Sequence, residues 1–240
     1  MTGLTDAGEP PRWSEATQAE LDRFGFSDPY DPRFIHTAIF GTKMAGHAMR
    51  WPHVDFNVLA EVNPDVVGWV RMEGSPIDYP VVAAHLDGSY YLRHNFSGEE
   101  SLHGQVALAF GCGRRMGGHN TVLAAHTMSD WSMFRAVRAL CDRHYLDAHP
   151  TIDLMAADGR SWHGRWFAAV CYNSTDPWPE RTRFADDADF AAWLRRVLGQ
   201  NWLYTGVRPG EHARVLTCCT CARTPGPYDM RAVFAVLEEA

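Results

Sequence analysis

The sequence predicts a mainly β protein built as an antiparallel or mixed barrel, with short helices inserted between its strands. Short apolar, β-prone runs separated by Gly- and Pro-rich turns indicate the strands. Strands and helices do not alternate strictly, which argues against a doubly wound parallel sheet. The last part of the chain gives a third indication. Residues 214–237 read as two apolar runs around a loop rich in Pro and Gly, which is the pattern of a hairpin.

About eight strands are predicted after residue 67. A chain of 240 residues with 46% hydrophobic residues is long enough to enclose one sizeable core with such a sheet. The expected strands are 68–72, 77–83, 105–110, 121–125, 151–155, 164–171, 215–221 and 231–237.

The first part of the chain is predicted to be helical. A helix over 14–24 can be capped by its first serine, and a second helix from Asp55 ends before an Asn-Pro pair. Residues 28–33, DPYDPR, are expected to form a turn. We therefore divide the chain into a flexible or helical appendage, residues 1–62, and a barrel domain, residues 63–240.

Two further helices are predicted within the barrel domain. Ser129 or Asp130 can cap a helix whose apolar residues include Phe134 and Val137. A second helix covers 186–198. Its apolar stripe follows the helical period and is interpreted as core packing: Phe190, Trp193, Leu194, Val197 and Leu198.

Charge and hydropathy exclude several classes of function. The net charge is -7, without the basic stripe that a nucleic-acid-binding protein needs. No apolar run approaches the roughly 18 residues of a membrane-spanning helix, and the N-terminus has no signal-peptide pattern. Six cysteines in a chain of this size do not suggest a disulfide framework.

The predicted C-terminal hairpin carries the residues best suited to chemistry. Cys221 is placed where the first strand ends, so its side chain can be both accessible and held. Arg231 opens the returning strand. A guanidinium near a thiol favours the thiolate and can bind a developing oxyanion. We therefore predict that Cys221 is a nucleophile and that Arg231 stabilises the oxyanion or positions the substrate.

Each of these two residues has a rival nearby. Cys219 shares a strand face with Cys221, whereas Cys218 faces the other way. We favour Cys221 because it is at the strand end, and expect Cys219 to line the floor of the site. Arg223 is also close to Cys221, but it belongs to the loop, so Arg231 is favoured.

His126 is the candidate general acid and base. It follows an apolar strand directly, at a strand-end rim where sites tend to form. A histidine near the thiol can hold the proton and pass it to a leaving amine. Together Cys221, His126 and Arg231 would supply the three roles that an acyl transfer needs.

Several segments resemble the sortase family, and specifically its class B branch. The hairpin segment TCCTC followed by an arginine that opens an apolar strand is similar to the family's active-site hairpin, with Cys218 in place of leucine. The stretch 121–134 is similar to its histidine segment, with Ala125 in place of glycine. Segments NPDVVGWV, IDYPVV and YYLRHN are similar to its early strands, in the same order. The resemblance covers residues 63–237.

The resemblance implies a closed barrel and a cysteine transpeptidase. Such an enzyme cleaves a sorting signal in a surface protein or pilin, holds the acyl group as a thioester on Cys221, and passes it to an amine of peptidoglycan or of a pilin. It implies a place at the outer face of the cell membrane, reached through an anchor that this sequence lacks. We expect the sequence to be a trimmed, soluble form of a longer chain, although another route to the membrane remains open. No cofactor or metal is implied.

Three other functions remain open. CCxC with a nearby histidine could bind zinc, although Cys112, Cys141 and Cys171 are isolated and supply no second ligand pair. A non-catalytic module of the same fold is disfavoured by the intact Cys, His and Arg. A cysteine peptidase that releases its acyl group to water cannot be separated from a transpeptidase by sequence.

Overall fold

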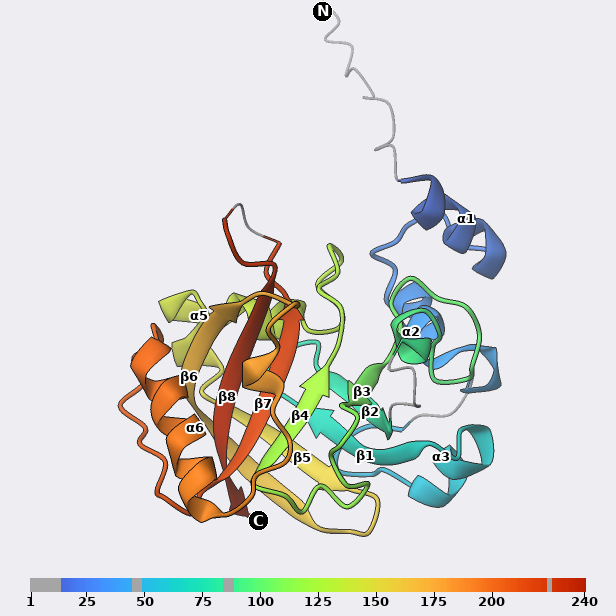
Figure 1. Ribbon diagram of the computed structural model, residues 1–240. Coiled ribbons are helices and arrows are strands. Elements are labelled where there is room, and N and C mark those ends of the chain that lie inside the picture. The colour runs from blue at the N-terminus through green and yellow to red at the C-terminus, as the bar shows by residue number, and fades with distance from the viewer. Residues whose placement is uncertain (1–13, 45–48, 84–88, 224–225) are drawn as a thin grey trace, which may run out of the picture.

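The computed structural model describes residues 14–44, 49–83, 89–223 and 226–240, and shows a closed β-barrel (Figure 1). The strands follow the order β1-β2-β3-β4-β7-β8-β6-β5. Two pairs, β2 with β3 and β4 with β7, are parallel, and the others are antiparallel. The predicted mainly β barrel is therefore confirmed. The strands are β1 Val66–Arg71, β2 Asp78–Ala83, β3 Val106–Leu108, β4 Asn120–Ala124, β5 Thr151–Ala156, β6 Ser161–Tyr172, β7 Arg214–Cys221 and β8 Met230–Glu239.

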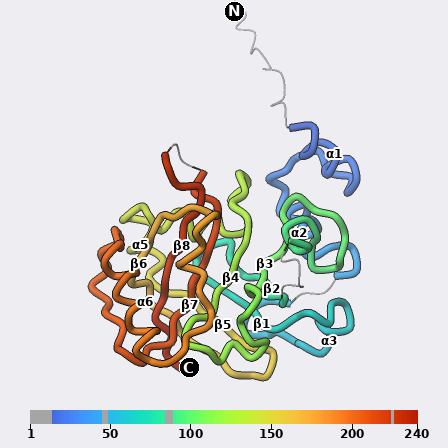
Figure 2. Tube along the Cα trace, in the orientation of Figure 1, coloured from blue at the N-terminus to red at the C-terminus, as the bar shows by residue number. Residues whose placement is uncertain are grey.

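Helices lie around the outside of this barrel (Figure 2). Figure 2 shows α1 and α2 to one side of it and α6 alongside β6 and β8. The α-helices are α1 Glu15–Phe24, α2 Pro32–Phe40, α3 Phe56–Val62, α4 Arg135–Ala139, α5 Arg143–Ala148 and α6 Asp187–Gln200, and the 3-10 helices are η1 Thr42–Met44, η2 Tyr90–Leu92 and η3 Trp178–Glu180.

Side-chain caps determine where the N-terminal helices begin. Ser14 caps α1 and Asp55 caps α3, each through its side-chain oxygen, as the sequence predicts. The expected turn at 28–33 is only partly right. Its last two residues belong to α2, because Asp31 caps this helix and Pro32 occupies its first turn. Backbone amides of the first turn have no partner within the helix, so the missing N–H of proline costs nothing there.

The proposed division at residue 62 falls between α3 and β1, but the core crosses it. Leu21 and Phe34 form a small separate cluster between α1 and α2. Ile39 of α2 and Leu59 of α3 belong to the same hydrophobic cluster as the barrel interior. The appendage therefore packs on the barrel, and the domain boundary remains a prediction. Residues 1–13 lie outside the described part of the chain.

The two faces of β7 are buried in different places. Leu216 and Cys218 lie in the cluster inside the barrel, whereas Val215 and Cys219 lie in the cluster under α6. The predicted stripe of α6 forms most of this cover, except that Leu198 is 43% exposed. Opposite faces for Cys218 and Cys219 follow directly from the alternation of side chains along a strand.

The helix after His126 begins later than predicted. It starts at Arg135, and neither Ser129 nor Asp130 caps it. The Asp130 side chain instead accepts hydrogen bonds from the amide and hydroxyl of Ser132. Residues 126–134 therefore form a structured turn, in which the amide of Phe134 donates to the carbonyl of His126 at 2.8 Å.

Replacement of Gly68 by alanine is expected to destabilise the barrel. A Cβ at this position would lie 2.4 Å from the carbonyl oxygen of Met155 on the paired strand, so the two strands would have to separate. The expected loss is about 1–3 kcal/mol in the free energy of unfolding, measured by urea denaturation. Gly199→Ala on α6, where no atom lies within 4 Å of the added Cβ, is the control. It should be stabilising by up to about 1 kcal/mol.

Candidate functional site

The parallel pairing of β4 with β7 brings the segments that carry Cys221 and His126 side by side. Ala124 is paired with Cys219, and the ladder continues through a hydrogen bond from the amide of Ala125 to the carbonyl of Cys219 at 3.2 Å. Two residues further along the chain, Ala124 is followed by His126 and Cys219 is followed by Cys221, the last residue of β7. Residues that lie level on neighbouring strands share a face of the sheet. The structure therefore brings the segment that carries His126 alongside the end of β7, where Cys221 lies.

Two threonines connect the ends of these strands. The hydroxyls of Thr127 and Thr220 are 2.7 Å apart, and the Thr220 hydroxyl lies 2.8 Å from the carbonyl oxygen of Ala125. The Thr127 hydroxyl also lies 3.3 Å from the carbonyl oxygen of Cys221. Both side chains are buried. Neither threonine was a predicted site residue, although Thr127 directly follows the histidine and Thr220 directly precedes the cysteine.

A backbone carbonyl orients the His126 ring. Its Nε2 lies 2.8 Å from the carbonyl oxygen of Leu92 in η2. A carbonyl only accepts, so Nε2 carries hydrogen and donates. Nδ1 is then the ring atom left to exchange a proton with a reacting group. The His126 side chain is half-buried, so it is both held and accessible.

Among the three neighbouring cysteines of β7, Cys221 is the accessible one. Cys218 is fully buried and Cys219 is 1% exposed, whereas Cys221 is half-buried. Burial raises the pKa of Cys218. Burial, together with the nearby Glu180 carboxyl, raises the pKa of Cys219 well above its usual range. Both therefore stay neutral thiols at physiological pH, and the arrangement favours Cys221 as the nucleophile.

Arg231 lies next to the site but its side chain turns away from Cys221. It is paired with Thr220, whereas Cys221 is paired with Met230, so Arg231 and Cys221 leave the sheet on opposite faces. The Arg231 guanidinium donates to the carbonyl of Arg138 at 3.3 Å and lies 5.3 Å from the centre of the Trp202 ring. Its predicted role on the oxyanion therefore requires another rotamer.

Arg223 lies closer to the histidine turn. Its guanidinium donates to the carbonyl of Thr127 at 3.0 Å, and its backbone adopts a positive φ of 46°. Thr127 is the residue that joins the ends of β4 and β7. In this conformation Arg223 is the cation on the histidine side of the hairpin, and the choice between it and Arg231 stays open.

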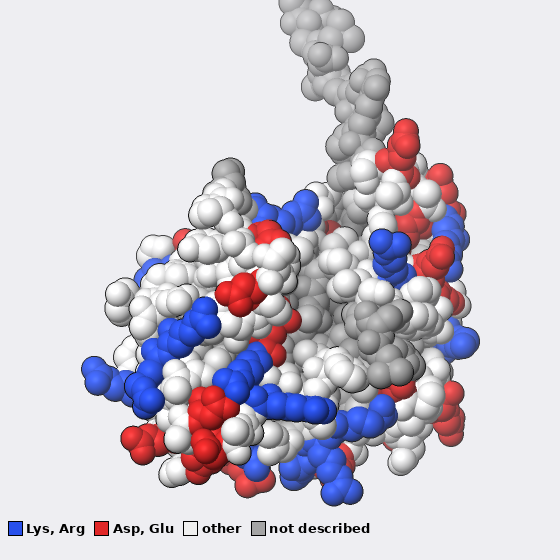
Figure 3. All heavy atoms as spheres, viewed as in Figure 1, with Lys and Arg blue, Asp and Glu red and all other residues white. Residues whose placement is uncertain are grey.

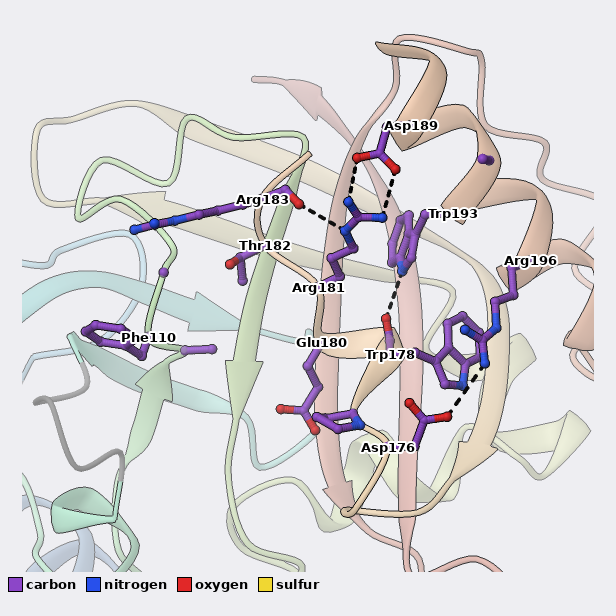
Figure 4. A pocket seen from close by; sticks show the side chains of 14 residues that line it. Phe110, Asp176, Trp178, Glu180, Arg181, Thr182, Arg183, Asp189, Trp193 and Arg196 are labelled. Carbon is purple, nitrogen blue, oxygen red and sulfur yellow. Dashed lines mark hydrogen bonds and ion pairs between the residues drawn. The ribbon is translucent and has the colours of Figure 1, made fainter. Parts of the chain in front are cut away.

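An open cavity of 970 Å³ lies beside α6 (Figure 4). Two of its lining residues, Trp178 and Trp193, pack in the same cluster as Cys219, which shares a face of β7 with Cys221. Neither Cys221 nor His126 lines the cavity itself. The connection from β6 to α6 forms one wall, and Phe110, which is 63% exposed, lies on the other. Asn120 on β4 donates to the carbonyl of Arg181 at 2.9 Å and accepts from the hydroxyl of Thr217 at 2.7 Å. This pair of hydrogen bonds fixes the connection over β4 and β7.

Charged side chains in this cavity are mostly paired. Figure 4 shows Arg181 directed at Asp189, to which it donates at 2.9 Å, and Arg196 beside Trp178, 4.1 Å from its ring centre. Figure 3 shows basic and acidic side chains interspersed on the same side of the molecule. Deeper in the wall, Glu180 accepts from the buried hydroxyl of Tyr172, and burial raises the pKa of Glu180. The cavity therefore offers an apolar surface with few free charges.

A buried network fixes the turn after His126 to the N-terminal helix. His103 is 3% exposed, and its Nε2 lies 2.7 Å from Asp130 Oδ2, while its Nδ1 lies 3.5 Å from Glu20 Oε2. Burial opposes a charge on the ring, but the two carboxylates outweigh it and raise the pKa of His103 to about 9. His103 lowers the pKa of both carboxyls in return, against the effect of burial. No local sequence pattern reveals this contact between residues 20, 103 and 130.

The described residues give no sign of a metal site or a membrane span. No group of three or more His, Cys, Asp or Glu side chains among them is arranged to hold a metal ion. Within the same ranges, no helix combines the length and apolarity that crossing a membrane requires.

The His103 network should make stability fall on both sides of neutrality. A raised histidine pKa stabilises the fold fully below about 6.5, and this contribution is lost as pH rises through about 9. The lowered pKa of Asp130 and of Glu20 stabilises above about 4 and is lost in acid. Urea midpoints measured from pH 6 to 9.5 should therefore decrease.

His103→Gln should lower the unfolding free energy at pH 6 by about 3–5 kcal/mol, because it leaves two buried carboxylates without a cation. The urea midpoint should fall accordingly. The substitution should also flatten the alkaline decrease. His163→Gln is the control, since His163 pairs with Asp153 at 2.7 Å with its side chain 49% exposed. An unchanged alkaline decrease in His103→Gln would show that another group titrates.

Comparison with known proteins finds sortase B relatives. No family model matches the sequence. Sortase B of Listeria monocytogenes is 31% identical over 163 residues, which are 68% of this chain and 65% of that protein. Sortase B of Staphylococcus aureus is 25% identical over 166 residues, 69% of this chain and 67% of that protein. The chain thus spans about two thirds of the length of these curated relatives.

Solved structures give the same fold. A Staphylococcus aureus sortase B–substrate complex matches with a TM-score of 0.71 and 22% identity, over 93% of this chain and 99% of that chain. Sortase B from Listeria monocytogenes matches with a TM-score of 0.65 and 27% identity, over 77% of this chain and 100% of that chain. The sequence similarity and the shared closed barrel together identify the chain as a sortase B-like protein.

Proposed function

We propose that the protein is a cysteine transpeptidase that cleaves a sorting signal and transfers its acyl group to an amine. The observation that carries this proposal is the half-buried Cys221 at the end of β7, whose parallel partner β4 leads directly into the segment with His126. Similarity to sortase B proteins supports it, and one structural relative is described as a substrate complex. Work at the outer face of the cell membrane, on a surface protein or pilin, belongs to the same proposal.

The reaction follows from the two side chains. The Cys221 thiolate attacks the scissile carbonyl carbon, and the carbonyl oxygen becomes an oxyanion. The C–N bond then breaks, while protonated His126 gives its Nδ1 proton to the departing amine, which leaves a thioester on Cys221. An incoming amine attacks the thioester, loses a proton to His126, and releases the thiolate. Water in place of the amine would give a peptidase.

The cavity under the β6–α6 connection is proposed to hold part of the sorting signal. Its lining residue Trp193 packs in the same cluster as Cys219, which shares a strand face with Cys221, and its wall includes exposed Phe110 opposite Trp178. An extended peptide could place apolar side chains there while its scissile bond lies at the strand ends. Specificity is therefore expected to depend on residues 173–182 and on the segment 93–100.

Cys221→Ala should abolish turnover and leave the fold intact, because the hydrophobic clusters do not depend on this half-buried thiol. The measurement is intact mass after incubation with a panel of sorting-signal peptides, with and without an amine acceptor. Wild type should gain a thioester mass on Cys221 that the amine discharges. Cys219→Ala is the matched control and should still acylate. Discharge by water alone would favour the peptidase, and acylation of Cys221→Ala would refute the assignment.

His126→Ala should reduce the acylation rate by about 10²–10⁴-fold, because it removes the group proposed to protonate the leaving amine. The cation is assigned by comparing Arg231→Ala with Arg223→Ala. We predict a loss of about 10²–10³-fold for Arg231→Ala and a small loss for Arg223→Ala, measured as kcat/KM. The reverse order would assign the oxyanion to Arg223, the side chain already next to Thr127.

A further inference from the structure

A second cavity, of 740 Å³, is lined by Arg231. The Arg231 side chain leaves the β7–β8 hairpin on the face opposite to the face that carries Cys221. Arg135 and Arg138 of α4 line the cavity from one side, and Arg231 of β8 lines it from the other. Trp131 forms part of its wall, with the Arg135 guanidinium 5.0 Å from the centre of its ring. Three cations thus converge on one cavity beside the candidate active site.

These guanidinium groups lack anionic partners. The ion pairs found among the described residues involve other arginines. Arg231 is 9% exposed, and its Nε and that of Arg138 are buried without a hydrogen-bond partner. Burial, with Arg135 and Arg231 nearby, lowers the pKa of Arg138. A buried cation without an anionic partner, as Arg231 is here, is costly, so the cluster is suited to an anion from outside the chain.

The other titratable groups of the cavity offset this charge only in part. Asp142 also lines it and contributes one negative charge, but its Oδ1 accepts from the amide of Tyr145 at 3.0 Å and caps α5, so the three arginines remain in excess. Burial raises the pKa of Cys141 to about 11, so this thiol is neutral. His144 and Tyr145 also line the cavity, and burial raises the pKa of the Tyr145 hydroxyl, so this group stays neutral.

The cavity adjoins the reacting centre through the backbone of the hairpin. Arg231 is paired with Thr220, the residue before Cys221, and Arg138 donates to the carbonyl of Arg223, two residues after it, at 3.4 Å. A molecule that reaches around this hairpin could place an amine at Cys221 and an acidic group among the arginines.

We propose that this arginine cavity binds the carboxylate or phosphate group of the amine acceptor, and so selects acceptors that carry an oxyanion. This inference rests on the proposed transpeptidase function for its biological meaning. The binding of an oxyanion can be tested without turnover.

The first test titrates the protein with inorganic phosphate and, separately, with acetate. The readout is the indole N–H signals of Trp131 and Trp202 in ¹H–¹⁵N spectra, since each ring lies beside a cavity arginine. Wild type should show saturable shifts. Arg138→Gln and Arg135→Gln should each weaken binding about tenfold or more, the value of a charge-assisted hydrogen bond.

The matched control is Arg195→Gln, which removes the same charge from an exposed position on α6. It should bind phosphate as wild type does. If Arg195→Gln weakened phosphate binding as much as the cavity variants do, only the net charge of the protein would matter and the proposal would be wrong. Unchanged phosphate binding in both Arg138→Gln and Arg135→Gln would also overturn it.

The second test compares acceptors that differ only in the oxyanion. The thioester on Cys221 is discharged with diglycine or diglycinamide, and with phosphoethanolamine or ethanolamine. Wild type should prefer the anionic member of at least one pair, which identifies the group as carboxylate or phosphate, and Arg138→Gln should lose that preference. Equal rates for both pairs would refute acceptor selection. Failure to form the thioester would refute only the proposed transpeptidase, because the phosphate titration is independent of it.

Discussion

The parallel ladder between β4 and β7 is the interaction on which the candidate site depends. Cys221 and His126 are far apart in the sequence, and the pairing of β4 with β7, which ends at Ala124 and Cys219, brings their segments together. A parallel pair cannot be joined by a tight turn, so the barrel must close around it through long connections. The hydrogen bonds of Thr127 and Thr220 extend this ladder just where the reacting side chains leave it. The fold thereby fixes two strand ends that would otherwise diverge.

Local patterns in the sequence predict much of this barrel. The strands and the helices α1, α3 and α6 appear as apolar periods bounded by caps and turn residues, and such signals act over a few residues. The accessible position of Cys221 at the end of a strand follows in the same way, and so do the opposite faces of Cys218 and Cys219. These features depend on backbone geometry, which is the same in any strand.

Features that depend on distant partners were not predictable. Asp130 is a reasonable helix cap by sequence, but the buried cation of His103 and the carboxylate of Glu20 place it in another network. The helix α4 therefore begins later, at Arg135. The direction of Arg231 is another case. Its position at the start of β8 was expected, but its register opposite Thr220 depends on how the hairpin pairs, and that pairing turns it away from Cys221.

The two faces of the hairpin suggest how donor and acceptor could be distinguished. In a transpeptidation His126 protonates the leaving amine and later deprotonates the incoming amine, so both nitrogens must occupy nearly the same position. The nitrogen itself therefore offers little basis for selection. Discrimination has to come from groups further away, in cavities that the other substrate does not enter. The cavity under the β6–α6 connection is largely apolar with most of its charges paired, whereas the arginine cavity contains cations without carboxylate partners among the described residues. Two chemically different surfaces on opposite sides of one nucleophile would let an apolar sorting signal and an anionic acceptor approach it without competing.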